Sequence, residues 1–307
     1  MRSLGLKNAD NKIITGANFK QFSATISERA IYIQRGFIMF RQLALNIVDL
    51  DSIIRALGNF NQFNDEAALV LWDFQAAFPS VTHAWIQAVF RFYGFPEGFL
   101  HFLSALLFHN FAIFSGNGPN IFLYLILAGI VQGCPSAGSC FAIAADPFFY
   151  LLACLQDRFP DKSHQHSQLN FRGCADDIGA AIASYKFLKV IKPVFDQAET
   201  FAGLMLNLRK CIIIPTKYSS FEANKLEIQE WLRRFLPGWQ GFKILPCAPY
   251  LGPSIGPAAG DNMWEKPVAK YWQCVLRIAS CNLSAYYAVL AYNSYAVSCP
   301  EYVCQMY

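Results

Sequence analysis

Apolar and polar positions along this chain follow two different periods, which predicts a mixed α/β fold. Apolar residues recur three and four positions apart over residues 41–57, 76–92 and 185–201, which is typical of helices with one buried face. Residues 136–155 form a nearly continuous apolar run that predicts a further helix. Residues 69–72 form a short apolar run that ends at an acidic residue, which predicts a strand.

Weaker patterns predict further elements. Residues 19–30 and the stretch from Pro96 to about residue 109 are helical in pattern, and so are the aromatic-rich residues 262–307. Residues 110–131 are predicted to form a hairpin, because residues 115–120 are a dense run of turn formers.

A second hairpin is predicted over residues 169–182, where Gly173 and Gly179 bracket two adjacent carboxylates between apolar runs. Asp176 and Asp177 repel each other unless a positive charge lies between them. A divalent cation bound by oxygen ligands meets that need. A plain solvated turn is the alternative, because Asp favours turns.

Two other segments add weight to the metal-binding interpretation. Asp73 follows the strand predicted at 69–72, and a Gln-Gly-Cys-Pro segment at 132–135 lies between Asp73 and Asp176. In this order and spacing, these segments resemble the palm of a reverse transcriptase of the non-LTR retrotransposon (LINE-like) type. The resemblance covers nearly the whole chain and is most specific over residues 69–256.

The resemblance implies a fold and a division of the chain. The fold is α/β with an α+β palm, in the right-hand architecture of polymerases with fingers, palm and a partial helical thumb. Residues 1–70 correspond to N-terminally truncated fingers, and residues 71–259 to a palm with a fingers insertion at about 110–131. Residues 260–307 correspond to a partial thumb.

The activity implied by the resemblance is DNA synthesis on an RNA template. Two Mg²⁺ ions, or Mn²⁺ in their place, would be held by Asp73 and Asp176, with weaker help from Asp177. Lys210 ends a Gly-Leu-x-x-Asn-x-x-Lys pattern and is implied near the triphosphate, as a proton donor to the leaving pyrophosphate. From the residues alone, Lys210 is a lysine that enters a strand.

Five further residues are implied at the incoming nucleotide. Arg2 and Lys12 would face its triphosphate, because cations on a finger can neutralise phosphate charge. Phe78 would exclude a ribose 2′-hydroxyl, and Gln132 and Gly133 would contact the nucleotide. Without the resemblance, the two cations are ordinary surface charges and Phe78 is a core aromatic residue.

The primer grip of the family corresponds to Tyr250, Leu251 and Gly252. The fingers pattern Gln-x-Gly-Phe is present at residues 34–37. Cys174 departs from the family, which has Phe or Tyr at this position. This departure removes aromatic packing behind the acidic pair but no metal ligand.

Composition excludes a disordered chain and raises a second possibility. Hydrophobic residues make up 54% of the chain and charged residues 15%, so an integral membrane protein is an alternative. The longest apolar stretches, 99–114 and 121–131, fall short of the ~20 residues that span a bilayer and are predicted to be a buried helix and a buried strand. The net charge of +4 is mild for a nucleic-acid-binding protein.

The 10 cysteines contain no CxxC pair and are predicted to be buried thiols in a reducing compartment. A zinc site that uses His164 and His166 is an alternative. The function predicted is an RNA-directed DNA polymerase core, with RNA template, DNA primer and deoxynucleoside triphosphates as partners and no membrane. The resemblance implies synthesis in the cytoplasm and action in the nucleus. The alternative is an inactive reverse-transcriptase-like remnant that at most binds nucleic acid.

Overall fold

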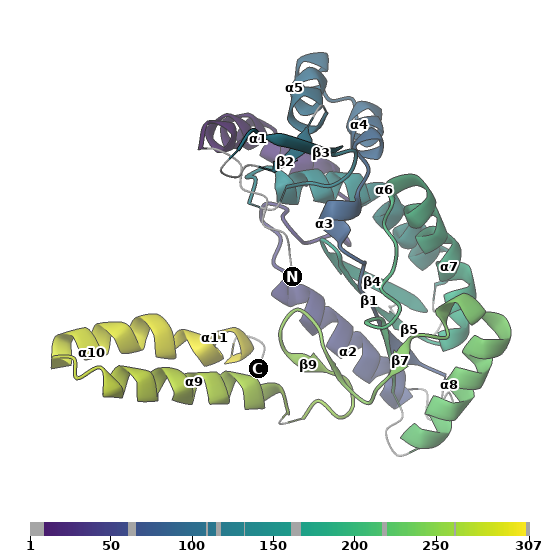
Figure 1. Ribbon diagram of the computed structural model, residues 1–307. Helices are drawn as coiled ribbons and strands as arrows, with labels where there is room; N and C mark the ends of the chain where they lie inside the picture. Colours follow the sequence, from purple (N-terminus) through teal and green to yellow (C-terminus); the bar gives the residue numbers. More distant parts are fainter. Residues whose placement is uncertain are drawn as a thin grey trace.

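The computed structural model describes residues 9–60, 66–108, 110–114, 118–131, 133–160, 167–216, 220–260 and 262–304 (Figure 1). In chain order the elements are α1 (Ala9–Arg29), α2 (Ala44–Phe60), β1 (Ala68–Trp72), α3 (Ala77–Ser80), α4 (His83–Phe92), α5 (Glu97–Leu107), β2 (Phe111–Phe114), β3 (Ile121–Leu125), α6 (Ala137–Arg158), β4 (Leu169–Cys174), β5 (Asp177–Ile182), η1 (Tyr185–Phe187), α7 (Leu188–Gln197), η2 (Ala198–Ala202), β6 (Ile212–Pro215), α8 (Phe221–Phe235), η3 (Pro237–Trp239), β7 (Lys243–Ile244), β8 (Ala248–Pro249), β9 (Ser254–Ile255), α9 (Asn262–Ser280), α10 (Ala285–Ala291), η4 (Tyr292–Ala296) and α11 (Ser298–Cys304). The segments η2 and η4 are π-helical turns.

A five-stranded sheet with the order β4-β5-β1-β6-β7 lies at the centre of the molecule. β1 pairs antiparallel with β5 on one side and with β6 on the other. All five residues of β1 are apolar and buried, as befits a strand covered on both faces. The strand predicted at 69–72 is therefore confirmed, and it occupies the middle of the sheet.

Each face of the sheet has its own core because successive side chains of a strand point to opposite sides. Val70 and Trp72 belong to the larger core with α6 and α7, and the Trp72 ring stacks on Phe195 with 5.2 Å between centroids. Leu69 and Leu71 belong to a smaller core with α2 and the β8–β9 hairpin. Figure 1 shows these layers around the sheet.

Two further parts extend from the sheet in different directions (Figure 1). Helices α1, α4 and α5 and the β2–β3 hairpin form a lobe at the top of the view, whereas α9, α10 and α11 project to the left as a helical hairpin. The top lobe has an aromatic core, in which Phe99 packs edge-on against Phe19 with 5.3 Å between ring centroids.

Most of the predicted elements are confirmed, including α2, α5, α6 and both hairpins. The helix predicted over 76–92 is instead broken into α3 and α4. The break occurs because the Thr82 side chain caps α4 by accepting a hydrogen bond from the Trp85 N–H. The apolar spacing over 76–92 also predicted that Phe92, at its end, packs inward, and this is wrong because the Phe92 side chain is 83% exposed.

The expectation of a buried strand within 121–131 is also wrong. All five residues of β3 are exposed, because β2 and β3 form a separate two-stranded sheet outside the central one. The stretch 99–114 divides into α5, which buries Phe99 and Leu103, and the largely exposed β2.

Among the described helices, α6 is long and apolar enough to cross a membrane by length and composition alone. A buried core helix passes the same test, and 61% of the apolar window of α6 is buried within the fold.

The cysteines are free thiols, but their burial is only partly as predicted. Cys134, Cys140 and Cys211 are buried, whereas Cys154, Cys281 and Cys304 are exposed. An apolar neighbourhood in the sequence did not ensure burial, because helices such as α11 lie largely at the surface.

Gly129 is a position where the backbone requires glycine. Its φ is +98°, and an added Cβ would lie 2.6 Å from the Pro79 carbonyl oxygen. We expect Gly129→Ala to lower the free energy of unfolding by about 2 kcal/mol, because it combines a left-handed backbone with a backbone clash. Urea denaturation measures this change.

Gly98→Ala is the matched control. Gly98 lies in the first turn of α5 with nothing within 4 Å of an added Cβ. Alanine should leave stability unchanged or raise it by up to ~1 kcal/mol. Equal effects of the two substitutions would contradict the assigned role of Gly129.

Candidate active site

Three ionisable side chains meet at one end of the central sheet. The register of β1 with β5, continued by one residue, places Asp73 opposite Asp177. The register of β1 with β6, continued past its last pair, places Lys210 opposite Asp73 on the other side. Directly opposed residues have Cβ atoms ~5 Å apart, so the side chains are neighbours. Asp176 lies in the adjacent turn between β4 and β5.

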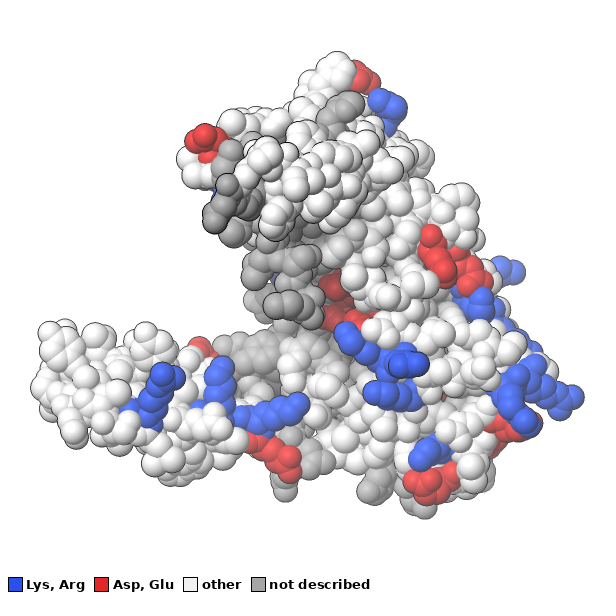
Figure 2. All heavy atoms as spheres, in the orientation of Figure 1, with Lys and Arg blue, Asp and Glu red and all other residues white. Residues whose placement is uncertain are grey.

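Lys210 holds Asp73 directly. Its Nζ lies 3.0 Å from Asp73 Oδ2, and the exposed fractions of the two side chains are 61% and 27%. The Asn207 N–H donates to the Asp73 carbonyl oxygen at 2.8 Å. The segment that ends at Lys210 therefore packs against the end of β1, and Figure 2 shows acidic and basic side chains side by side near the centre of this face.

The three carboxylates Asp73, Asp176 and Asp177, here called the acidic cluster, influence one another. Burial raises the pKa of Asp177 to about 6, with further contributions from the charges of Asp176 and Asp73, and Lys210 opposes this only in part. Burial and the charges of Asp177 and Asp176 also raise the pKa of the Cys174 thiol to about 11. Cys174 is thus a neutral thiol at the site.

The acidic cluster suits a divalent cation, although no three His, Cys, Asp or Glu side chains of the described residues converge as a preformed metal site. Asp73 Oδ2 is buried and accepts no hydrogen bond from the described residues. It forms an ion pair with the Lys210 ammonium. Carboxylate oxygens are the ligands that Mg²⁺ prefers. A cation at the cluster would replace Lys210 at Asp73 and relieve the mutual repulsion of the carboxylates.

Gln34 fixes the turn that carries Asp176, and the sequence analysis did not identify it as a site residue. The Gln34 side chain is fully buried, and its Oε1 accepts the N–H groups of Gly36 at 2.9 Å and Ala175 at 3.0 Å. Ala175 has a φ of +57°, which is unusual for a residue other than glycine. A Cβ on Gly36 would lie 2.3 Å from the Ala175 nitrogen. The Gln-x-Gly-Phe pattern was the signal that could have revealed this contact.

Phe78 and Gly133 line the same pocket. The pocket has a volume of about 520 Å³ and is lined by Phe37, Phe78, Gly133, Cys134, Pro135, Ala137, Gly138 and Ser139. Phe78 is half-buried, and its ring stacks on Phe141 with 4.5 Å between centroids. Phe78 therefore packs against the core and also lines the pocket.

Of the remaining residues implied at the nucleotide, only Lys12 belongs to the described part of the chain. Lys12 is exposed on α1, and no ion pair of the described residues joins it to Asp73. Arg2 and Gln132 lie outside the described residues, and so do His164 and His166 of the zinc alternative.

Of the three residues assigned to the primer grip, Tyr250 is buried in the sheet. This side chain is only 4% exposed, and its hydroxyl donates to the Arg172 carbonyl oxygen at 3.2 Å. Its ring packs over Gly179, where an added Cβ would lie 3.1 Å from Tyr250 Cζ. These contacts anchor the β8–β9 hairpin to the sheet, and Leu251 and Gly252 form its turn.

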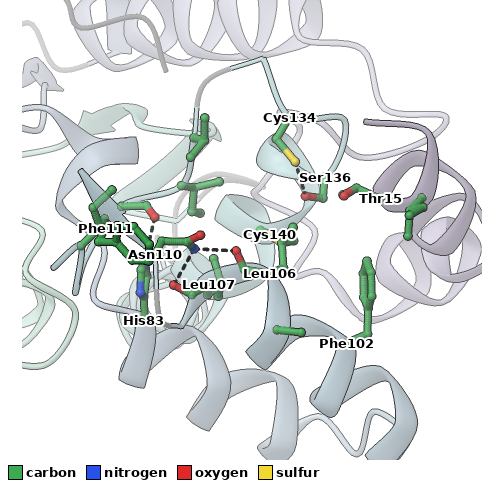
Figure 3. A pocket seen from close by; sticks show the side chains of 16 residues that line it. Thr15, His83, Phe102, Leu106, Leu107, Asn110, Phe111, Cys134, Ser136 and Cys140 are labelled. Carbon is green, nitrogen blue, oxygen red and sulfur yellow. Dashed lines mark hydrogen bonds between the residues drawn. The ribbon is translucent and has the colours of Figure 1, made fainter. Parts of the chain in front are cut away.

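A second cavity, of about 580 Å³, lies in the top lobe (Figure 3). The side chains of His83 and Asn110 in its lining form hydrogen bonds with backbone carbonyl groups. His83 Nε2 lies 2.9 Å from the Gly129 carbonyl oxygen, and burial lowers the pKa of His83. Asn110 donates to the carbonyl oxygens of Leu106 and Leu107, both at 2.9 Å. Because these groups already bond to the protein, the acidic cluster is the better candidate for catalysis.

Gln34→Leu tests the support of the turn. The substitution leaves two buried N–H groups without an acceptor, so we expect the free energy of unfolding to fall by about 2–4 kcal/mol. Hydrogen exchange at the amides of Gly36 and Ala175 should become faster. Gln42→Leu changes an exposed glutamine and is the control. Unchanged exchange at Ala175 would exclude this role of Gln34.

Asp177→Asn tests the crowding of charge. A carboxyl whose folded pKa is raised to about 6 favours the fold only at low pH, and this contribution is lost as the pH rises through that value. In a chelating buffer, Asp177→Asn should therefore raise Tm by a few degrees at about pH 7 and leave it unchanged at about pH 4.

The exposed Asp196, which pairs with Lys192, provides the matched control Asp196→Asn. This substitution should not raise Tm at either pH. If Asp177→Asn fails to raise Tm at neutral pH, the three carboxylates do not repel one another as described.

Comparison with solved structures shows what this fold is similar to. Apo telomerase from Candida tropicalis matches with a TM-score of 0.55 and 8% identity over 88% of this chain and 44% of that chain. Telomerase from the same organism, in complex with a TWJ fragment of telomeric RNA, matches with a TM-score of 0.54 and 10% identity over 96% of this chain and 45% of that one.

No protein-family model and no curated protein sequence matches the chain. The chain spans less than half the length of the telomerase chains, and identities this low show the fold alone. The chain has the mixed α/β architecture of a reverse-transcriptase-like polymerase.

Proposed function

We propose that the chain is the core of an RNA-directed DNA polymerase that extends a primer 3′-hydroxyl with deoxynucleotides. The observation that supports this proposal is the meeting of Asp177, Asp73 and Lys210 at the ends of three adjacent strands, with Asp176 in the neighbouring turn. The motifs quoted above favour a non-LTR origin. One of the solved structures of similar fold, telomerase from Candida tropicalis, is a complex with a fragment of telomeric RNA.

Each residue of the site has a role in this proposal. Asp73 and Asp176 would hold two Mg²⁺ ions, with weaker help from Asp177. When bound, the metal would lower the pKa of the primer hydroxyl and stabilise charge on the leaving group. Lys210 would leave its ion pair with Asp73, contact the departing pyrophosphate and donate a proton to the pyrophosphate. Phe78 and Gly133 would border the sugar of the nucleotide.

The helical hairpin offers a surface for the template and primer backbones. The basic residues of α9 are Lys266, Lys270 and Arg277. Spacings of four and seven residues place them on one face of the helix. Figure 2 shows basic side chains along the visible face of this hairpin, where phosphates could bind them.

One observation favours a second candidate, an inactive remnant that at most binds nucleic acid. Lys210 occupies Asp73, and within the described ranges no three potential ligands converge. Cys174 also stands where the family has an aromatic residue. Such a protein would bind primer–template without extending it.

Primer extension at low salt with Mg²⁺ separates the two candidates. We expect extension by few nucleotides per encounter, and Asp73→Asn or Asp176→Asn should reduce it at least about a hundredfold, because each removes a metal ligand. Fluorescence anisotropy should show unchanged binding of primer–template by both variants. Asp196→Asn changes an exposed carboxylate on α7 that pairs with Lys192 and is not part of the acidic cluster, so it should leave extension unchanged.

Binding without extension by the parent chain would support the inactive remnant and reject the polymerase. Extension that survives in Asp73→Asn would also reject the proposed site.

Phe78→Ala tests the assignment of the nucleotide pocket. The smaller side chain enlarges the pocket beside the sugar, so ribonucleotide incorporation should rise at least about tenfold relative to deoxynucleotide incorporation. Phe159→Ala truncates a half-buried aromatic residue outside this pocket and controls for lost packing. Unchanged sugar selectivity in a folded Phe78→Ala protein would assign Phe78 to the core alone.

A further inference from the structure

The helical hairpin of α9, α10 and α11 has little core of its own. No residue of α10 is buried. The buried cluster at the base of the hairpin consists of Ala259, Met263 and Val303, with Cys247 and Trp264 packed against it. Farther out, apolar burial contributes little to the association of the helices.

Two thiols lie close together between α9 and α11, in this weakly packed part of the hairpin. Cys274 on α9 lies with its Sγ 3.8 Å from Sγ of Cys299 on α11. The hydroxyls of Tyr271 and Tyr292 meet nearby at 3.1 Å and also join α9 to the returning chain. Since a disulfide has its sulfurs ~2.05 Å apart, a small side-chain movement is enough to join the thiols.

The π-helical turn η4 sets this alignment. A π turn adds one residue to a helix and rotates everything after it by about 100° relative to a continuous α-helix. The turn covers Tyr292–Ala296 and comes shortly before Cys299. It therefore determines which face of α11 is turned to Cys274.

We propose that Cys274 and Cys299 form a dithiol modification site that an anionic low-molecular-weight disulfide, such as oxidised glutathione, converts into a cross-link between α9 and α11. Cys299 lines an open pocket of about 340 Å³, so a small reagent can reach it. Lys266 and Lys270 also line this pocket and attract an anion, with Glu265 as the acidic residue of the lining. The proposal is independent of the polymerase function.

The reaction is two successive thiol–disulfide exchanges. The Cys299 thiolate attacks one sulfur of oxidised glutathione, and the first glutathione thiolate leaves and takes up the proton that Cys299 released. The Cys274 thiolate then attacks the Cys299 sulfur, and the second glutathione leaves and takes up the proton from Cys274. The protein loses two protons and two electrons, and the reagent takes them up to become two molecules of reduced glutathione.

The test uses the full chain in a mixture of oxidised and reduced glutathione. After alkylation of the remaining thiols, mass spectrometry should find peptides joined through Cys274 and Cys299 before any other pair of the ten cysteines. Cys274→Ser and Cys299→Ser should each abolish the link. Cys281→Ser removes an exposed thiol next to α9 and should leave it intact.

Limited proteolysis gives a second readout. The cross-link should slow cleavage within the hairpin at least about tenfold, and dithiothreitol should reverse the protection. Cys299→Ala serves if serine disturbs the packing, and it should lack the protection as well.

Three results would overturn the proposal. They are linkage of Cys281 or Cys304 to either thiol at an equal rate, glutathione that stays on Cys299 without the second exchange, and a cross-link that gives no protection. None of these readouts involves a nucleotide or a primer, so their outcome is separate from that of the extension assay.

Discussion

The pairing of β1 with β5 on one side and β6 on the other is the constraint on which the candidate site depends. A slip of one residue would exchange the two faces of β1 and move Trp72 out of the larger core. Because both faces of β1 are buried, such a slip would be strongly unfavourable. The same register that satisfies the two cores therefore also aligns Asp177, Asp73 and Lys210 at the end of the sheet.

Several locally unfavourable features gather at this end. A left-handed alanine carries the turn, a buried glutamine holds it, and burial together with nearby like charges raises the pKa of Asp177 to about 6. Sequences that fold well keep such conflicts few, and those that persist are concentrated at functional sites. The surrounding sheet supplies the stability that tolerates them. This concentration distinguishes the acidic cluster from the cavity in the top lobe, where polar groups bond to their neighbours.

Local patterns were sufficient to predict the acidic hairpin, since a tight turn between two apolar runs is encoded within a few residues. They could not predict that Asp177 and Lys210 flank Asp73, because that depends on pairing between strands far apart in the chain. The resemblance to known reverse transcriptases supplied the grouping of these residues.

Other errors have a similar origin. Helical spacing put Phe92 on a packed side, but the end of α4 lies outside the core. Apolar composition suggested burial of β3, but burial needs a covering layer, which no pattern within the strand encodes.

The central proposal is that the acidic cluster binds a divalent cation in competition with Lys210, which pairs with Asp73. Titration with Mn²⁺, followed by the paramagnetic signal of the free ion, tests it directly. The account predicts that Asp73→Asn weakens Mn²⁺ binding at least about tenfold, whereas Lys210→Met strengthens it by removing the competing ammonium. Equal Mn²⁺ affinity in the parent chain and both variants would contradict the account.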